Sequence, residues 1–405
     1  KMIKIKSQSI YRFLFFVFLF VIVSRGFFEL FLEKKTAFLI QVAVILVFLG
    51  LNLSFFRIKL KSKYLLIQFV FFIIFVFAAF FSSMITRYLE NGGAPFFYSG
   101  IMCFLAFIAI MLSSLNLNKF MQLDIGKSIS FLILILFGVA IYEQFTKTLM
   151  PGAWYYNGTV RPASLTGSKQ HYSIILSILS LFVFQYWLSL KKRVYLIAFI
   201  IGVIGVFLSL TRSGAMILVL AFIPFIFYKF CVKYQINIKV KVLIYLVFCL
   251  CVFVIFIILF LDIEFFFERI LSSIDTKSAG NGERMRAWIK GLDLIFNNNN
   301  LFLGQYTGVI TNATRTVTNT KSFVVESGTL QLILNFGLLG FLSFYLILFS
   351  FVLRIRKNHV FLFAVLFSCL CSTIVYQSIE TIPFIVLLSL LPLISININI
   401  LASNN

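Results

Sequence analysis

Basic side chains that could bind an anion stand in two short segments near the middle of the chain. Arg161 precedes the first of these, residues 167–171, which contains Gly167, Lys169 and His171 and leads into an apolar run. A basic, glycine-containing loop that enters a helix N-terminus can hold a phosphate group, because the free backbone N–H groups and the helix dipole both favour anions. We therefore expect Arg161, Lys169 and His171 to bind substrate, with solvated loop charges as the alternative for Arg161 and Lys169.

The second segment is the turn at 211–214, where Arg212 stands between two apolar runs with almost no loop around it. An arginine in so tight a turn lies near the outer membrane boundary, where it must reach water, pair with an acid or bind an anionic group. The nearest acids on that side are far away in sequence. An anionic ligand is therefore favoured.

The long segment 262–325 and its end supply the remaining candidates. Arg284 and Arg286 lie within it, and the fork of a guanidinium group suits a diphosphate better than the point charge of a lysine does. Surface ion pairs with neighbouring glutamates are the alternative for both arginines. Glu326 begins the next apolar run, where desolvation should raise the pKa of its carboxyl group, as a general base near neutrality requires.

Other ionisable residues have simpler interpretations. Arg25 and Glu29 are spaced i, i+4, as are Glu143 and Lys147, so both couples are predicted to be helix pairs. Glu380, between the last two apolar runs, marks an outer turn. The sequence has no GxxxxGK[ST] nucleotide-binding loop, dinucleotide fingerprint, zinc-protease or serine-hydrolase pattern. We therefore expect neither a nucleotide substrate nor a metal ion or other cofactor.

These residues belong to a chain with the composition of a membrane protein. Of its 405 residues, 61% are hydrophobic and 12% are charged, whereas soluble domains are about half apolar and a quarter charged. This excludes a water-soluble globule. The net charge of +22 lies in short clusters between apolar runs, whereas nucleic-acid binding needs the charge gathered on one solvated face.

Twelve apolar runs are long enough to be membrane-spanning helices. They cover residues 10–32, 37–56, 64–86, 96–115, 128–149, 172–190, 194–210, 214–230, 242–261, 326–353, 359–378 and 382–400. The expected fold is thus an all-α polytopic membrane protein.

The lengths of the connectors divide the chain into three parts. Residues 1–261 hold helices 1–9 with short loops and one medium loop at 150–171, and residues 326–405 hold helices 10–12. Between them lies a large periplasmic loop, 262–325. A loop of that length is usually functional or disordered.

The large loop contains a pattern that predicts an amphipathic helix capped by Asn281. The apolar residues that recur at helical spacing are Met285, Trp288, Ile289, Leu292, Ile295 and Phe296. With this face down, the helix would lie on the outer membrane surface or on the bundle.

Charge in the connectors orients the chain. If the N-terminus is cytoplasmic, the connectors on that side and the N-terminal tail hold 20 basic residues and one acid, Asp124. The positive-inside rule therefore puts both termini in the cytoplasm.

The second half of the chain, about residues 158–345, resembles the O-antigen polymerase and O-antigen ligase family of bacterial envelope glycosyltransferases. The segment 208–215, LSLTRSGA, looks like the family's arginine turn. Residues 284–288 followed by 303–308 look like its arginine, tryptophan and glycine stretch. The segment 326–340 looks like its re-entry into the membrane.

One departure at the re-entry favours a polymerase. Ligases carry a histidine there, then Asn, Ser or Gln, nine residues and Gly-x-x-Gly. Ser327, Gly337 and Gly340 keep this register, but Glu326 takes the place of the histidine. An acidic residue at that position could act as the base of a polymerase.

The resemblance implies a GT-C-like architecture in the bacterial inner membrane and a transferase of lipopolysaccharide synthesis that uses no metal. On the periplasmic face, a growing chain on undecaprenyl diphosphate would pass to the sugar hydroxyl of a new lipid-linked repeat unit. Glu326 and Arg212 would be catalytic, and Arg161, Lys169, His171, Arg284 and Arg286 would bind substrate. The arginines at 161, 212 and 284 would clamp the diphosphate.

The expected partners are undecaprenyl-diphosphate-linked repeat units, membrane lipid, a chain-length regulator and a flippase, and no nucleic acid. The alternatives are an O-antigen ligase and a lipid-linked oligosaccharide flippase or transporter. Transporters tend to contain internal repeats and helices broken at mid-membrane, and the sequence shows neither. A long structured outer loop also favours the polymerase.

Overall fold

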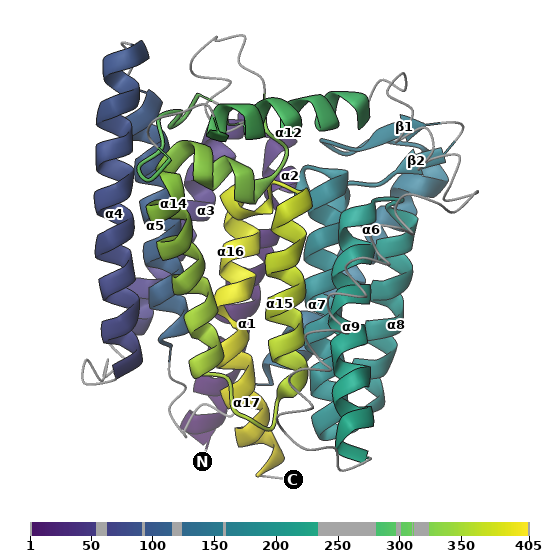
Figure 1. Cartoon of the computed structure of the whole chain (residues 1–405). Coiled ribbons are helices and arrows are strands. Elements are labelled where there is room, and N and C mark those ends of the chain that lie inside the picture. The colour runs from purple at the N-terminus through teal and green to yellow at the C-terminus, as the bar shows by residue number, and fades with distance from the viewer. Residues whose placement is uncertain are drawn as a thin grey trace.

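The structure of the protein is a computed structural model. It describes residues 2–53, 63–90, 94–115, 124–156, 159–233, 281–296, 301–309, 311 and 324–403. Long helices stand side by side in a bundle, and both termini lie at the same end (Figure 1). We call that end the termini end and the opposite one the loop end.

Most long helices of the bundle match the predicted apolar runs, but the first run, 10–32, is divided, because α1 ends at Val23. The long helices are α1 (Met2–Val23), α3 (Lys34–Leu53), α4 (Lys63–Glu90), α5 (Ala94–Ser113), α6 (Ile125–Thr146), α7 (Lys169–Leu190), α8 (Arg193–Leu208), α9 (Arg212–Lys233), α14 (Gly328–Phe349), α15 (Val360–Val375) and the consecutive α16 (Ile382–Ser389) and α17 (Leu391–Ala402).

Shorter elements gather mainly at the loop end. These are α2 (Arg25–Glu29), the hairpin of β1 (Trp154–Tyr156) and β2 (Thr159–Arg161), η1 (Ser164–Thr166) and η3 (Ser378–Glu380), whereas η2 (Ser350–Leu353) continues α14. Helix α12 (Asn281–Phe296) lies across the loop end of the bundle (Figure 1).

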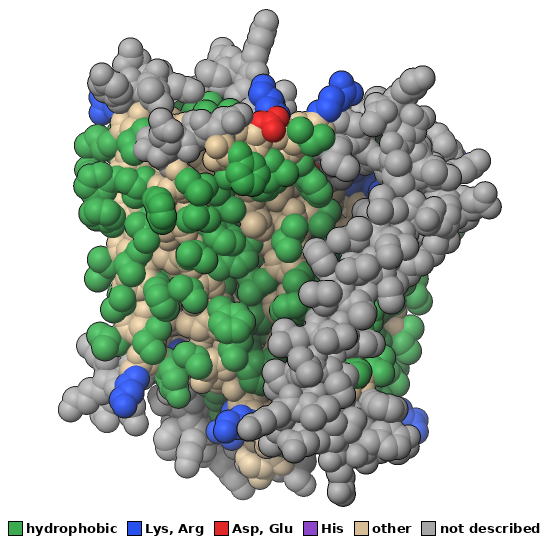
Figure 2. Space-filling model, in the orientation of Figure 1, with side chains coloured by type: hydrophobic (Ala, Val, Ile, Leu, Met, Phe, Trp, Pro, Cys, Tyr) green, Lys and Arg blue, Asp and Glu red, His purple; other side chains and the backbone are tan. Residues whose placement is uncertain are grey.

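The described helices have the length and surface of membrane spans. Eight of them are long and apolar enough to cross a membrane, and three shorter apolar helices cover Ile10–Val23, Arg193–Leu208 and Val360–Val375. Hydrophobic side chains cover the flank of the bundle, while Lys and Arg gather at the two ends (Figure 2). The protein is an all-α polytopic membrane protein, as predicted. The run predicted at 242–261 lies outside the described residues.

Helix α8 shows how a span divides between lipid and protein. Its exposed side is apolar, with Val194, Ile197, Ile200, Ile204 and Phe207 about half exposed. Its other side packs against α6 and α7. Such a helix is hydrophobic all round because both of its surroundings are apolar.

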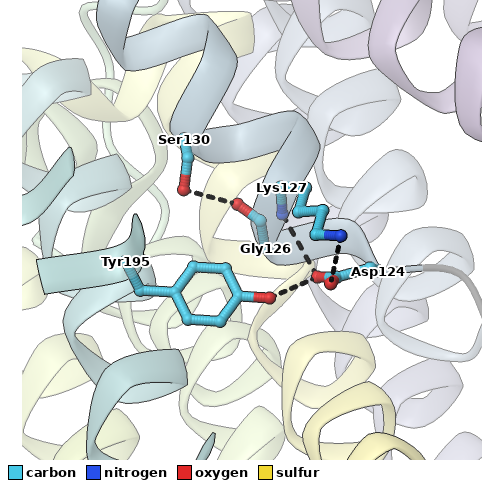
Figure 3. Close-up of polar contacts among 5 residues, drawn as sticks. All are labelled: Asp124, Gly126, Lys127, Ser130 and Tyr195. Atoms are coloured by element: carbon cyan, nitrogen blue, oxygen red, sulfur yellow. Dashed lines mark hydrogen bonds and ion pairs between the residues drawn. The ribbon is translucent and has the colours of Figure 1, made fainter. Parts of the chain in front are cut away.

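Asp124 ties α6 to α8 at the termini end (Figure 3). Its carboxylate caps α6 by accepting the backbone N–H of Lys127 at 3.3 Å, and it accepts the hydroxyl of Tyr195 at 2.6 Å. The ammonium of Lys127 lies 3.8 Å away. Because Asp124 and Tyr195 are both buried, each needs this partner to offset its desolvation.

Helix α14 is broken at Gly337, whose φ of 67° and ψ of −175° are not helical. A side chain there would be strained by the positive φ, and its Cβ would lie 2.2 Å from the carbonyl oxygen of Phe302. Only glycine therefore fits this position. The sequence indicated no broken helix, and that interpretation was wrong, because one glycine in an apolar run leaves the helical pattern intact.

Residues 301–306 form backbone hydrogen bonds to α14 on both sides of its break. The N–H groups of 338–339 donate to the carbonyls of 301–302 at 2.9 and 3.2 Å, and the N–H groups of 305–306 donate to the carbonyl of Leu334 at 3.2 Å each. Gly304 also approaches closely, since an added Cβ would lie 2.6 Å from the nitrogen of Gly337. The two predicted glycine motifs, at 303–308 and 326–340, thus contact each other through their backbones.

The predicted helix in the large loop exists, but its buried face differs from the predicted stripe. Trp288, Leu294 and Ile295 pack near Val325 and Leu334, and Gly291 is buried. Ile289 is 51% exposed, Leu292 41% and Phe296 82%. The contact with α14 determines which face of α12 is buried, so apolar residues beside that contact remain exposed.

We predict that Asp124→Ala lowers the stability of the detergent-purified protein by about 1–3 kcal/mol. The variant loses a helix cap and leaves the buried Tyr195 hydroxyl without an acceptor. Thermal unfolding of the variant, of Tyr195→Phe and of the wild type measures this. A melting temperature of Asp124→Ala equal to the wild-type value would contradict the prediction.

We also predict that Gly337→Ala lowers the yield and melting temperature of the folded protein. The new Cβ meets a backbone carbonyl and a conformation that L-residues avoid. Gly138→Ala in α6 is the matched control, because an added Cβ there has no atom within 4 Å. Alanine in that helix should be neutral or stabilising by up to about 1 kcal/mol. Equal melting of the two variants would refute the role of Gly337.

Candidate active site at the loop end

Arg161 reaches from the hairpin to the arginine turn. Its Nη2 donates to the carbonyl of Leu210 at 2.8 Å, and its Nε donates to the carbonyl of Ser209 at 3.5 Å. Arg212, two residues after Leu210, is the first residue of α9. The structure thus places Arg161 against the turn that leads to Arg212, which is 51 positions later in the sequence.

The N-terminus of α7 lies beside the same turn. Gly214 in the first turn of α9 packs directly on Ser173 of α7, where an added Cβ would lie 2.0 Å from the Ser173 hydroxyl oxygen. Ser168 caps α7 by accepting the N–H of Gln170 at 3.3 Å. The first turns of α7 and α9 therefore adjoin, as a shared anion site requires.

Lys169 and the hairpin contact one another through an aromatic ring. The ammonium nitrogen of Lys169 lies 3.7 Å from the ring centroid of Trp154, and Trp154 pairs with Arg161 across the hairpin. A cation over an aromatic face is favoured electrostatically. The contact places the ammonium of Lys169 next to the hairpin that carries Arg161.

Glu143 fixes the loop that presents these cations. The fully buried carboxylate accepts the N–H of Met150 at 3.1 Å and the N–H of Ser164 at 2.7 Å. The prediction of a helix pair with Lys147 was wrong, because Lys147 ends α6 in a left-handed conformation and is exposed. By contrast, the ion pair of Arg25 and Glu29 is confirmed at 2.7 Å.

Glu326 stands where the chain re-enters the bundle. The next residue, Ser327, caps α14 by accepting the N–H of Leu330 at 3.3 Å. Gly328 packs on the turn after α15, since an added Cβ would lie 3.3 Å from the carbonyl oxygen of Tyr376. Glu326 itself is partly exposed.

His171 connects the re-entry to the cationic side of the site. Its ring meets the ring of Tyr376 edge to face, with centroids 6.4 Å apart. Tyr376 therefore lies between His171 on α7 and the start of α14. Gly328, two residues after the predicted base, and His171, at the start of α7, thus both contact Tyr376 at the loop end.

Arg284 and Arg286, the other two predicted substrate-binding residues, lie on α12. Arg284 lies in α12, but its side chain is outside the described part. Arg286 is exposed on the same helix. Their contribution to substrate binding remains a prediction.

Glu380 is a candidate that the sequence did not single out. Its Oε1 accepts hydrogen bonds from the hydroxyl of Tyr98 on α5 and from the amide Nε2 of Gln331 on α14. Burial raises the pKa of this carboxyl group from 4.5 to about 7, and the two hydrogen bonds act in the opposite direction. Its interpretation as a turn marker was incomplete, because its partners come from helices remote in sequence.

Residues 197–345 match the model of a family described as O-antigen ligase. The matched region contains Arg212, Glu326 and Gly337, and it begins in α8 and ends in α14. No curated protein matches the chain.

The chain therefore carries a domain of the O-antigen ligase family, and the predicted relationship to O-antigen ligases and polymerases is confirmed at that level. The protein is a multi-pass membrane protein, and the match covers residues 197–345 of its 405 residues. The choice between ligase and polymerase rests on the chemistry of the site.

We predict that Glu143→Ala makes the loop at 150–168 more sensitive to protease and weakens binding of a polyprenyl diphosphate. Two backbone N–H groups lose their buried acceptor, at a cost of about 1–3 kcal/mol each. Limited proteolysis and lipid binding measure the two effects. Lys147→Ala is the control and should behave as the wild type. Equal effects of both variants would restore the helix-pair interpretation.

Proposed function

We propose that the protein is a repeat-unit polymerase of a bacterial surface polysaccharide. It would transfer the growing chain from undecaprenyl diphosphate to a new lipid-linked repeat unit. The observation that carries the proposal is the convergence of the hairpin, the starts of α7 and α9, and the re-entry before α14 at one end of a membrane-embedded bundle. This arrangement suits a substrate with a lipid tail and a charged headgroup at the membrane boundary.

The cationic side of the site would bind the donor diphosphate. Arg161 lies against the turn that precedes Arg212, and the capped N-terminus of α7 adjoins it. These groups would stabilise the charge that develops as the diphosphate leaves. Donors positioned for a developing charge contribute about 3 kcal/mol each.

The acidic side would bind and activate the acceptor. The sugar hydroxyl oxygen attacks the anomeric carbon of the donor, and the bond from that carbon to the diphosphate oxygen breaks. The electron pair leaves with the diphosphate, and the hydroxyl proton passes to the carboxylate of Glu326. General-base catalysis of this kind contributes about 10²–10⁴-fold.

The distribution of charge supports a periplasmic site in the inner membrane. The positive-inside rule assigns the basic connectors, and with them both termini, to the cytoplasm. Both termini lie opposite α12 and the hairpin (Figure 1). The loop end would then face the periplasm, where lipid-linked repeat units are presented.

A ligase is the second candidate, because the matching family model is described as O-antigen ligase. The two activities differ in their acceptor. A polymerase uses another lipid-linked repeat unit, whereas a ligase uses the lipid A core. Glu326 in place of the ligase histidine favours the polymerase.

The broken helix α14 is a feature that transporters also have. In this chain residues 301–306 occupy the break through backbone hydrogen bonds. A structural role for the break is therefore favoured over a substrate path.

The decisive experiment incubates the purified protein with a lipid-linked repeat unit, without nucleotide or divalent ion. We expect a ladder of products on a gel. Glu326→Gln should lower the rate by about 10²–10⁴-fold, and Arg212→Ala by about 10²–10³-fold. Glu33→Gln and Arg87→Ala, two exposed residues, are the matched controls and should polymerise normally.

The same assay separates the candidates. Transfer of a single chain to a lipid A core acceptor, without a ladder, would identify a ligase. A ladder of wild-type length from Glu326→Gln would overturn the assignment of the base. Absence of any transfer to either acceptor would overturn the proposal that the protein is a glycosyltransferase.

A further inference from the structure

Glu380 offers one carboxylate oxygen to a ligand. Both hydrogen bonds, from Tyr98 and from Gln331, go to Oε1. Within the part of the chain that the structure describes, Oε2 has no hydrogen-bond partner, and it is absent from the fully buried unpaired atoms. The residue keeps partial exposure. Oε2 is therefore held in place by the bonds to Oε1 and remains open to an incoming donor.

Glu380 flanks the same helix start as Glu326. Gln331, its amide partner, lies one turn after Ser327, and the N–H of Gln331 donates to the Ser327 carbonyl at 2.9 Å. Gly328 packs against the turn that carries Glu380, since an added Cβ would lie 3.3 Å from Ile379. Two carboxylates thus lie at the loop end of α14, on segments that pack together.

The surroundings of Glu380 contain further polar atoms without partners. The amide oxygen of Gln331 and the hydroxyl of Ser378 are buried and make no hydrogen bond with the described residues. Buried polar groups are nearly always paired. An unpaired amide oxygen on a residue that contacts the carboxylate, and an unpaired hydroxyl two residues before it, indicate a site that suits a polar, uncharged group.

We infer that Glu380 binds the acceptor sugar, with the ionised Oε2 accepting a hydrogen bond from a hydroxyl next to the one that reacts. The inference rests on the proposed function and adds the group that orients the acceptor. A sugar hydroxyl fits because it can donate to the carboxylate or to the amide oxygen of Gln331 and can accept from the hydroxyl of Ser378. A uronic acid at this place is disfavoured, because two carboxylates would repel.

The division of roles follows from the hydrogen bonds. Glu380 is held by two donors from α5 and α14, which suits a fixed binding group. Glu326 would take the proton of the reacting hydroxyl. Loss of Glu380 should therefore weaken acceptor binding, and loss of Glu326 should slow the transfer step.

Ionisation of Glu380 gives the inference a pH signature. The titratable groups on the elements packed around it are Tyr98 on α5, Tyr345 on α14, and Cys371 and Tyr376 at the end of α15, with Glu326 before α14. The pKa of Glu380 is raised to about 7 by burial, and the hydrogen bond from Tyr98 lowers it. Acceptor affinity should fall as the pH drops through 7. In Tyr98→Phe this fall should begin at a higher pH.

The test uses the full-length protein and an acceptor that cannot act as donor, a repeat unit joined to its lipid through an ether. Glu380→Gln should raise the KM for this acceptor by about 10–100-fold, as expected for one hydrogen bond to a charged group. Its kcat should stay within about threefold. Glu326→Gln should lower kcat instead, and Glu33→Gln should change neither.

Tyr98→Phe keeps the inference testable if Glu380→Gln does not fold. In Tyr98→Phe, the fall of kcat/KM for the acceptor at low pH should begin at a higher pH than in the wild type. An unchanged pH dependence, or a Glu380→Gln variant that loses kcat with the wild-type KM, would overturn the inference.

Equilibrium binding of the same ether-linked acceptor, without donor, distinguishes failure of the inference from failure of the proposed function. If the wild type binds the acceptor but forms no product, the polymerase proposal fails. Weaker binding by Glu380→Gln would still support the sugar site in that case. Equal binding by both proteins would reject it.

Discussion

Backbone polar groups in a hydrocarbon environment must find partners within the protein, and the break in α14 makes this constraint acute. At Gly337 the helix gives up its own hydrogen bonds, and residues 301–306 supply replacements. The contact fixes the outer part of α14, which begins two residues after the candidate base. It also anchors residues 301–306 of the large loop. The position of the re-entry therefore depends on a backbone contact rather than on a side chain.

The same constraint organises the cationic side of the site. Glu143 accepts two backbone N–H groups of the hairpin loop, and Arg161 donates to two carbonyls of the arginine turn. In both cases an ionisable side chain satisfies backbone groups of a loop or turn. Charged residues near the membrane boundary thus build the loops as well as the proposed anion site.

The loop end and the termini end use buried carboxylates differently. Asp124 caps a helix and accepts from Tyr195 and Lys127, and both of its oxygens have partners. Glu380 also accepts from a tyrosine, but only one of its oxygens has a partner among the residues that the structure describes. A carboxylate with both oxygens engaged stabilises the fold. One with an open oxygen can also bind a ligand, which is why the two similar clusters have different proposed roles.

The sequence alone determined the all-α membrane fold and most of the described long helices, because apolar runs are local patterns. Arg161, Arg212, His171 and Glu326 could be proposed as site residues for the same reason. Only the tertiary structure decided that α14 is broken, that Glu143 binds backbone groups, and that Glu380 is held by Tyr98 and Gln331. Each of these depends on contacts between residues remote in the chain. The hydrophobicity of a short segment does not indicate which remote residue a buried side chain contacts.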